Sequence, residues 1–144
     1  MKNSKKIMLA SLLIAAGYST LASAHSQSGS LGASASGATD VYAVTCGAGT
    51  AKLFLQVKDL APVVAPKVSI QATKGAASST LSTDAVDGDA VYSPGVTVAG
   101  TPGVFTLKVN KSAVAGAETY VAQFHCQTSA GAHTDTTWAM TQNQ

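Results

Sequence analysis

The sequence predicts an all-β fold, a small two-sheet sandwich of about seven strands with one disulfide. Short segments alternate apolar and polar residues with a period of two, which is typical of strands with one buried face. Turn-forming glycines recur between these segments. Alanine is frequent and favours helix, but no segment keeps apolar residues at i, i+3 and i+4 over three turns. We therefore expect strands throughout the folded part.

The first 24 residues are expected to be a targeting segment outside the fold. Three lysines, at positions 2, 5 and 6, precede an apolar run from Ile7 to Gly17, and Ala22-Ser23-Ala24 gives the small-x-small pattern that signal peptidases accept. The apolar run is shorter than the roughly 20 residues needed to cross a bilayer. We expect cleavage after Ala24, export to the periplasm or the medium, and no transmembrane segment in the mature chain.

The mature chain, His25 to Gln144, would have the length of a single domain and little net charge. Six lysines remain against six aspartates and one glutamate, so the net charge is −1 with neutral histidines. The sequence has no arginine, the residue best suited to phosphate recognition, and no cluster of lysines. We therefore expect neither nucleic acid nor a membrane surface as a partner.

Residues 25–39 predict a Ser/Gly/Ala-rich N-terminal arm ahead of a sandwich domain at 40–144. The stretch HSQSGSLGASASGA over 25–38 is small, polar and rich in glycine, as in flexible arms. The same residues could instead pair as an edge strand if the domain offers a free sheet edge. Composition leaves both alternatives open.

The strands of the domain follow from the alternation of apolar and polar residues. The clearest one is Lys67–Thr73, where Val68, Ile70 and Ala72 alternate with polar residues. Glu118 to Trp138 predicts a hairpin, with one strand through Cys126, an Ala-Gly turn and a second strand. The other predicted strands are Val41–Cys46, Lys52–Lys58, Val96–Val98 and Val104–Val109.

Cys46 and Cys126 are the only cysteines and predict one disulfide, because an exported chain meets an oxidising compartment. We prefer this bridge to two free thiols or an intermolecular link. It would close a loop of about 80 residues and contribute roughly 4.5 kcal/mol on the chain-entropy model. Such a link matters here because Ala, Gly, Ser and Thr dominate the composition, and small side chains bury little apolar area.

The residues around the two cysteines resemble an immunoglobulin-like domain. Val44-Thr45-Cys46 and Phe124-His125-Cys126 are similar to its second and sixth strands, whose cysteines bridge the two sheets. The resemblance covers a few residues on each side, and no tryptophan follows Cys46 in the next strand. It implies an immunoglobulin-like architecture rather than membership of that family.

The sequence lacks the common catalytic signatures, and we expect no enzymatic activity. It contains no nucleophile elbow, phosphate loop or dinucleotide fingerprint. Glu118 is the only glutamate, which leaves little for a paired-carboxylate hydrolase, and the disulfide removes both thiols. Asp84, Asp87 and Asp89 lack the spacing of a calcium loop. We interpret these aspartates as turn-forming residues on a solvated loop.

The three histidines predict a metal site. Cleavage after Ala24 would give His25 a free α-amine, which together with its imidazole Nδ1 can chelate one metal ion. A further nitrogen from His125 or His133 would complete the three-nitrogen set that suits Cu(II). Asp135 could supply an axial oxygen or orient a ring. His125 should face away from the Cys126 side, whereas the face of His133 depends on strand register.

Together, His25, the processing site and the sandwich resemble the terminal-histidine copper sites of exported β-sandwich proteins. These are the periplasmic copper carriers and the lytic polysaccharide monooxygenases. The resemblance implies Cu(II) at His25. Ser26 and Gln27 stand where the carriers commonly have a second histidine.

We therefore expect an exported, non-catalytic β-sandwich module with a surface, matrix or assembly role. Its low charge, its Thr/Ser/Ala-rich strands and an arm able to add to a neighbouring sheet favour self-association or binding to another exported protein. The alternative is a periplasmic or secreted copper-binding protein that uses His25 with His125 or His133.

Overall fold

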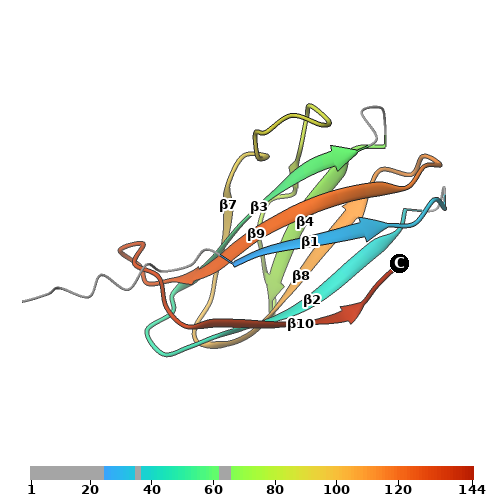
Figure 1. Ribbon diagram of the computed structural model, residues 1–144. Coiled ribbons are helices and arrows are strands. Elements are labelled where there is room, and N and C mark those ends of the chain that lie inside the picture. Colours follow the sequence, from blue (N-terminus) through green and yellow to red (C-terminus); the bar gives the residue numbers. More distant parts are fainter. Residues whose placement is uncertain (1–24, 35–36, 62–65) are drawn as a thin grey trace, which may run out of the picture.

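Ten strands and no helix make up the part of the chain that the computed structural model describes, residues 25–34, 37–61 and 66–144. The predicted targeting segment at 1–24 and residues 35–36 of the predicted arm lie outside these ranges. The strands form two antiparallel sheets that pack face to face (Figure 1). Within the described ranges, no helix is long and apolar enough to cross a membrane.

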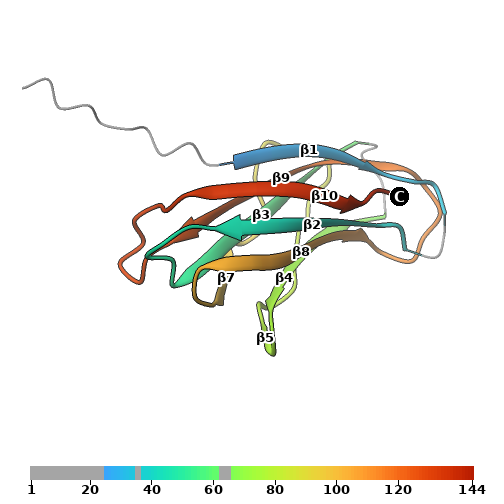
Figure 2. The same ribbon diagram turned by 90° about the horizontal axis from the view of Figure 1, so that it is seen from below.

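Each sheet combines strands that are distant in the sequence, and Figure 2 shows the same layers turned by 90°. Sheet A has the order β1 (His25–Leu31), β9 (Glu118–Gln127), β3 (Lys52–Ala61) and β7 (Val96–Ala99). Sheet B has the order β10 (Thr136–Gln142), β2 (Thr39–Cys46), β8 (Gly103–Lys111), β4 (Val68–Lys74) and β5 (Ala77–Ser78), and β6 (Ser82–Thr83) also pairs with β4.

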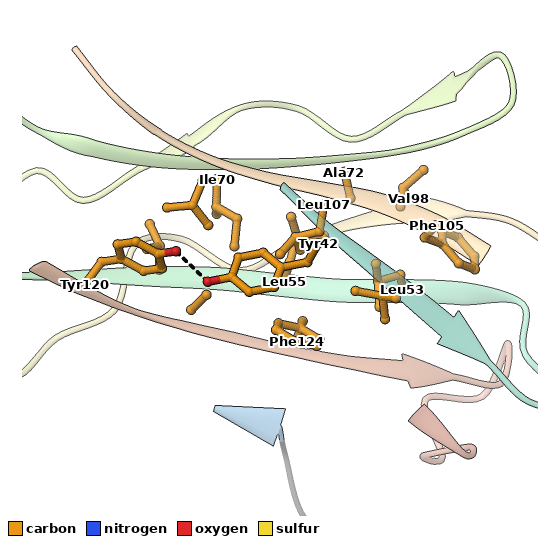
Figure 3. Packing of buried hydrophobic residues seen from close by; sticks show 14 of the residues in the cluster. Tyr42, Leu53, Leu55, Ile70, Ala72, Val98, Phe105, Leu107, Tyr120 and Phe124 are labelled. Carbon is orange, nitrogen blue, oxygen red and sulfur yellow. Dashed lines mark hydrogen bonds between the residues drawn. The ribbon is translucent and has the colours of Figure 1, made fainter. Parts of the chain in front are cut away.

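The core lies between the sheets because alternate residues of each strand point inward. Leu53, Leu55 and Val57 of β3 are fully buried, as are Ile70 of β4 and Leu107 of β8. Figure 3 shows Leu53, Leu55, Ile70 and Leu107 among the buried side chains between the strands. Burial of one such side chain contributes about 1.5–3 kcal/mol relative to leaving it exposed.

The disulfide joins Cys46, at the end of β2 in sheet B, to Cys126, near the end of β9 in sheet A. The two Cα atoms are 5.6 Å apart. The predictions of an all-β fold, two sheets and this bridge are confirmed.

Residues 25–31 form a paired edge strand, so the structure selects the second of the two alternatives for the arm and not a flexible segment. β1 pairs with β9 over seven residue pairs, from His25 opposite Phe124 to Leu31 opposite Glu118. A Cβ atom on Gly29 would lie 2.3 Å from the Tyr120 ring. Glycine at this position therefore allows β1 to approach the core.

The predicted hairpin over Glu118–Trp138 is wrong beyond its turn. Gln127 and His133 form one isolated bridge, and the Thr134 amide donates to the Cys126 carbonyl at 2.9 Å. The chain then crosses to sheet B, where Thr136 pairs with Cys46. The alternation of residues correctly predicts that β10 is a strand, but a period of two does not specify which sheet supplies the partner.

A loop covers the part of β3 that β7 leaves free. β7 pairs only with the first half of β3, up to Leu55. Further along, the amide of Ser93 donates to the Val57 carbonyl at 2.7 Å, and the amide of Gly88 donates to the Asp59 carbonyl at 3.1 Å. Residues 84–95, called the edge loop below, therefore act as an irregular strand on this edge.

Candidate functional site

His125 and His133 meet on the outer face of sheet A. The neighbours of His125 on β9, Phe124 and Cys126, point into the core, so His125 points outward. His133 lies opposite Gln127, which shares the face of His125. The two imidazole centroids are 4.1 Å apart. The bridge thus fixes the register that the sequence left open.

The ring of His125 packs against Phe54 of β3, the residue directly opposite it. The two rings are stacked with centroids 4.8 Å apart, and His125 is 9% exposed. Its Nε2 lies 3.0 Å from Nε2 of Gln127, whereas its buried Nδ1 has no hydrogen-bond partner. Burial, and then the nearby charges of His133 and His25, lower the pKa of His125 to about 4. The ring is therefore neutral at neutral pH, the form that binds metals.

His25 enters this region on the neighbouring strand. It lies opposite Phe124, the residue that precedes His125 on β9. Its side chain shares the inward side with Phe124 and is half-buried. His25 is near enough to His125 for its charge to lower the pKa of that ring.

Asp135 lies beside the turn that follows β2. Its carbonyl accepts a hydrogen bond from the amide of Gly47 at 2.8 Å. A Cβ atom on Gly47 would be 2.8 Å from Cβ of Asp135, so the two backbones are closely packed. Among the residues described by the structure, no three His, Cys, Asp or Glu side chains form a group that could hold a metal ion.

Three residues near the histidines were not identified from the sequence. Phe54 carried a signal, because it is the one large apolar residue on the polar face of its strand. No sequence signal pointed to Gln127, because its contact with His125 depends on the geometry of the turn. Trp138 of β10 forms edge contacts with Phe124 and Tyr42, at 6.5 and 5.8 Å between centroids, and remains 38% exposed.

Comparison with known proteins assigns no role to these residues. No protein-family model, curated protein or solved structure matches the chain.

Proposed function

We propose that this protein is an exported, non-catalytic module of immunoglobulin-like architecture that binds Cu(II) at its histidine cluster. The cluster consists of His25, His125 and His133. One observation carries the proposal: the pairing of β1 with β9 places the backbone of His25 opposite Phe124, the residue next to His125, whose ring lies 4.1 Å from that of His133. These are all the histidines in the chain, and they come from positions as far apart as 25 and 133.

The donor set follows from the chemistry of an N-terminal histidine. Cleavage after Ala24 would replace a peptide bond by a free amine, and this amine and Nδ1 of His25 would close a chelate ring. One imidazole of the His125–His133 pair would add the third nitrogen. Cu(II) favours such tetragonal nitrogen coordination. This donor set consists of two imidazole side chains and one backbone amine. It therefore does not require three side chains around one point.

The surroundings of His125 suit this role. Its ring is neutral at neutral pH, and its Nδ1 is a buried polar atom without a partner. The stacked Phe54 ring would restrict the rotation of the imidazole and exclude water from one side. The ring of His25 lies on the inward side of β1. To reach His125, this ring would have to turn around the end of the strand, where removal of Ala24 would leave His25 as the terminal residue.

Copper titration of variants tests the donor set. The mature protein beginning at His25 should bind one Cu(II). His125→Asn combined with His133→Asn should weaken binding by at least about tenfold, because loss of even an outer-shell partner of a ligand costs about 10–100-fold in metal affinity. Asp89→Asn, on the edge loop, is the matched control and should bind as the wild type does. Unchanged affinity in the double variant would reject this site.

A second candidate function, self-association, is favoured by the position of β1. β1 is the end strand of sheet A, only Leu31 of its seven residues is buried, and it has neither the lysines nor the prolines that protect edges. A strand from a second copy, or from another exported protein, could pair with it.

Light scattering at increasing concentration tests this second function. Association should be abolished by Ser28→Lys, which adds a charge to β1, and should be retained in Thr137→Lys on β10, the end strand of sheet B. A full-length protein that stays monomeric at millimolar concentration would reject self-association.

A further inference from the structure

Two buried carboxyl groups, those of Asp59 and Glu118, interact with each other far from the histidine cluster. Asp59, near the end of β3, is 0% exposed, and Glu118, the first residue of β9, is 1% exposed. Oδ2 of Asp59 accepts a hydrogen bond from the amide of Val68 at 3.0 Å. Oδ1 of Asp59 and both side-chain oxygens of Glu118 have no partner while the two groups are ionised. These carboxyls can bond to each other only if one keeps its proton.

More negative charge surrounds the pair. The edge loop brings Asp84, whose Oδ2 accepts from the Asp59 amide at 2.8 Å, and Asp87, whose buried Oδ1 has no partner. The charge of Lys111 acts on Glu118, but its ammonium donates to the carbonyls of Val114 and Gly116, at 3.0 and 2.6 Å. The pair is therefore not neutralised by a direct ion pair.

Full ionisation of this pair is unfavourable. Burial, with Asp59 and Asp87 nearby, raises the pKa of Glu118 to about 7. Burial also raises the pKa of Asp59 to about 6, despite the bond from the Val68 amide. In a site of low dielectric, ionisation of one carboxyl raises the pKa of the other. The pair therefore retains one proton at mildly acidic pH.

We propose that Asp59 and Glu118 share one proton, and that this proton acts as a latch which holds the edge loop on β3. With the proton bound, the edge loop stays on β3. When the proton is lost to solvent above neutral pH, repulsion from the pair displaces Asp84 and Asp87 and opens the edge loop. The second half of β3 then becomes a free strand edge. This proposal is independent of the histidine cluster.

The contacts of the edge loop make such opening measurable. The amides of Gly88 and Ser93 donate to β3 carbonyls, and the Ser93 hydroxyl accepts from the Val57 amide at 3.0 Å. Hydrogen exchange of the mature, disulfide-bonded protein should be compared at pH 5.5 and 8.0, after correction for the intrinsic exchange rates. Protection at Gly88 and Ser93 should fall by roughly tenfold at the higher pH. This is the change expected if loss of the shared proton weakens the attachment of the edge loop by the equivalent of one pKa unit.

Glu118→Gln provides the matched variant, because it keeps the shape of the side chain and can donate to Asp59 at every pH. It should keep the edge loop protected at pH 8.0, while Asp135→Asn, an exposed carboxylate beside Gly47, should behave as the wild type does. Equal protection of the wild type at both pH values, or an unchanged pH response in Glu118→Gln, would overturn the proposal.

Two further measurements decide the outcome if Glu118→Gln does not fold. The side-chain ¹³C signal of Glu118 in the wild type should titrate near neutral pH, and a midpoint near the ordinary value of about 4.3 would overturn the proposal. Addition of CaCl₂ at pH 8.0 should leave the exchange unchanged. Restored protection would show that the carboxyls hold a cation and would also overturn it.

Discussion

The hydroxyl oxygens of Tyr42 and Tyr120 lie 2.5 Å apart and link the two sheets through the core (Figure 3). Tyr120 also donates to Oδ2 of the buried Asp40 at 2.6 Å, so the proton between the tyrosines comes from Tyr42. The chain Tyr42–Tyr120–Asp40 thus satisfies three buried polar groups in an otherwise apolar interior.

Tyr120→Phe should destabilise the protein by about 1–3 kcal/mol, because it leaves Oδ2 of Asp40 buried without this donor. Tyr42→Phe is the matched control. It should cost less, since Tyr120 still donates to Asp40. Urea unfolding of both variants measures the difference, and an equal cost would contradict the assigned direction of the hydrogen bonds.

Gly29→Ala should release β1 from sheet A. The added methyl group would lie 2.3 Å from the Tyr120 ring, a contact that only movement of the strand or of this buried ring can relieve. Hydrogen exchange should show that β1 amides lose protection, whereas Ser28→Ala on the exposed side should leave them protected. Equal protection in the two variants would contradict the register of β1 on β9.

Alternation of residues was sufficient to predict the strands that form the core. Val44 and Leu53 are buried where a period of two placed them. The disulfide was predicted from a count of two cysteines in a chain with a predicted export signal. For His25–Leu31, composition left the arm and the edge strand equally open, because a free edge on β9 is a property of the folded domain.

Other features depend on contacts that no local pattern encodes. The chain crosses from sheet A to sheet B before Thr136. In the sequence, the strand that follows looks the same as the second strand of a hairpin. Burial of Asp59 with Glu118 joins residues 59 positions apart, and Asp84, expected on a solvated loop, is buried because its carboxylate bonds to the Asp59 amide. The face of His133 was fixed only by its bridge to Gln127.

His125 should make stability fall as the pH is lowered from about 6.5 to about 4. The unfolded chain binds a proton in this window, whereas the folded ring, with a pKa of about 4, does not. The difference of about 2.5 pKa units corresponds to roughly 3 kcal/mol.

Asp59 and Glu118 have the opposite effect on stability over part of the pH range from about 4 to about 6.5, because their pKa values are raised. Their stabilisation is present at low pH and is lost as the pH rises toward 7. The wild type should therefore be compared with His125→Gln by urea unfolding at pH 4 and pH 7. The stability difference between them should change by up to about 3 kcal/mol, and a constant difference would contradict the burial of a neutral His125.

Trp138 should report on copper at His25. Its ring contacts Phe124, the residue opposite His25, and it is the only tryptophan in the chain. Cu(II) quenches nearby indole fluorescence, so one equivalent should lower the emission of the mature protein. Zn(II), which is not paramagnetic, serves as the control. Unchanged emission at saturating Cu(II) would contradict a site beside β1.

Electron paramagnetic resonance of the Cu(II) complex tests the role of the free amine most directly. Mature protein that begins at His25 should bind one Cu(II) and show hyperfine splitting from several nitrogens. The same chain with one alanine added before His25 should lose this spectrum, because the amine no longer belongs to the chelating residue. Identical spectra and affinities for the two chains would contradict the proposed terminal-histidine site.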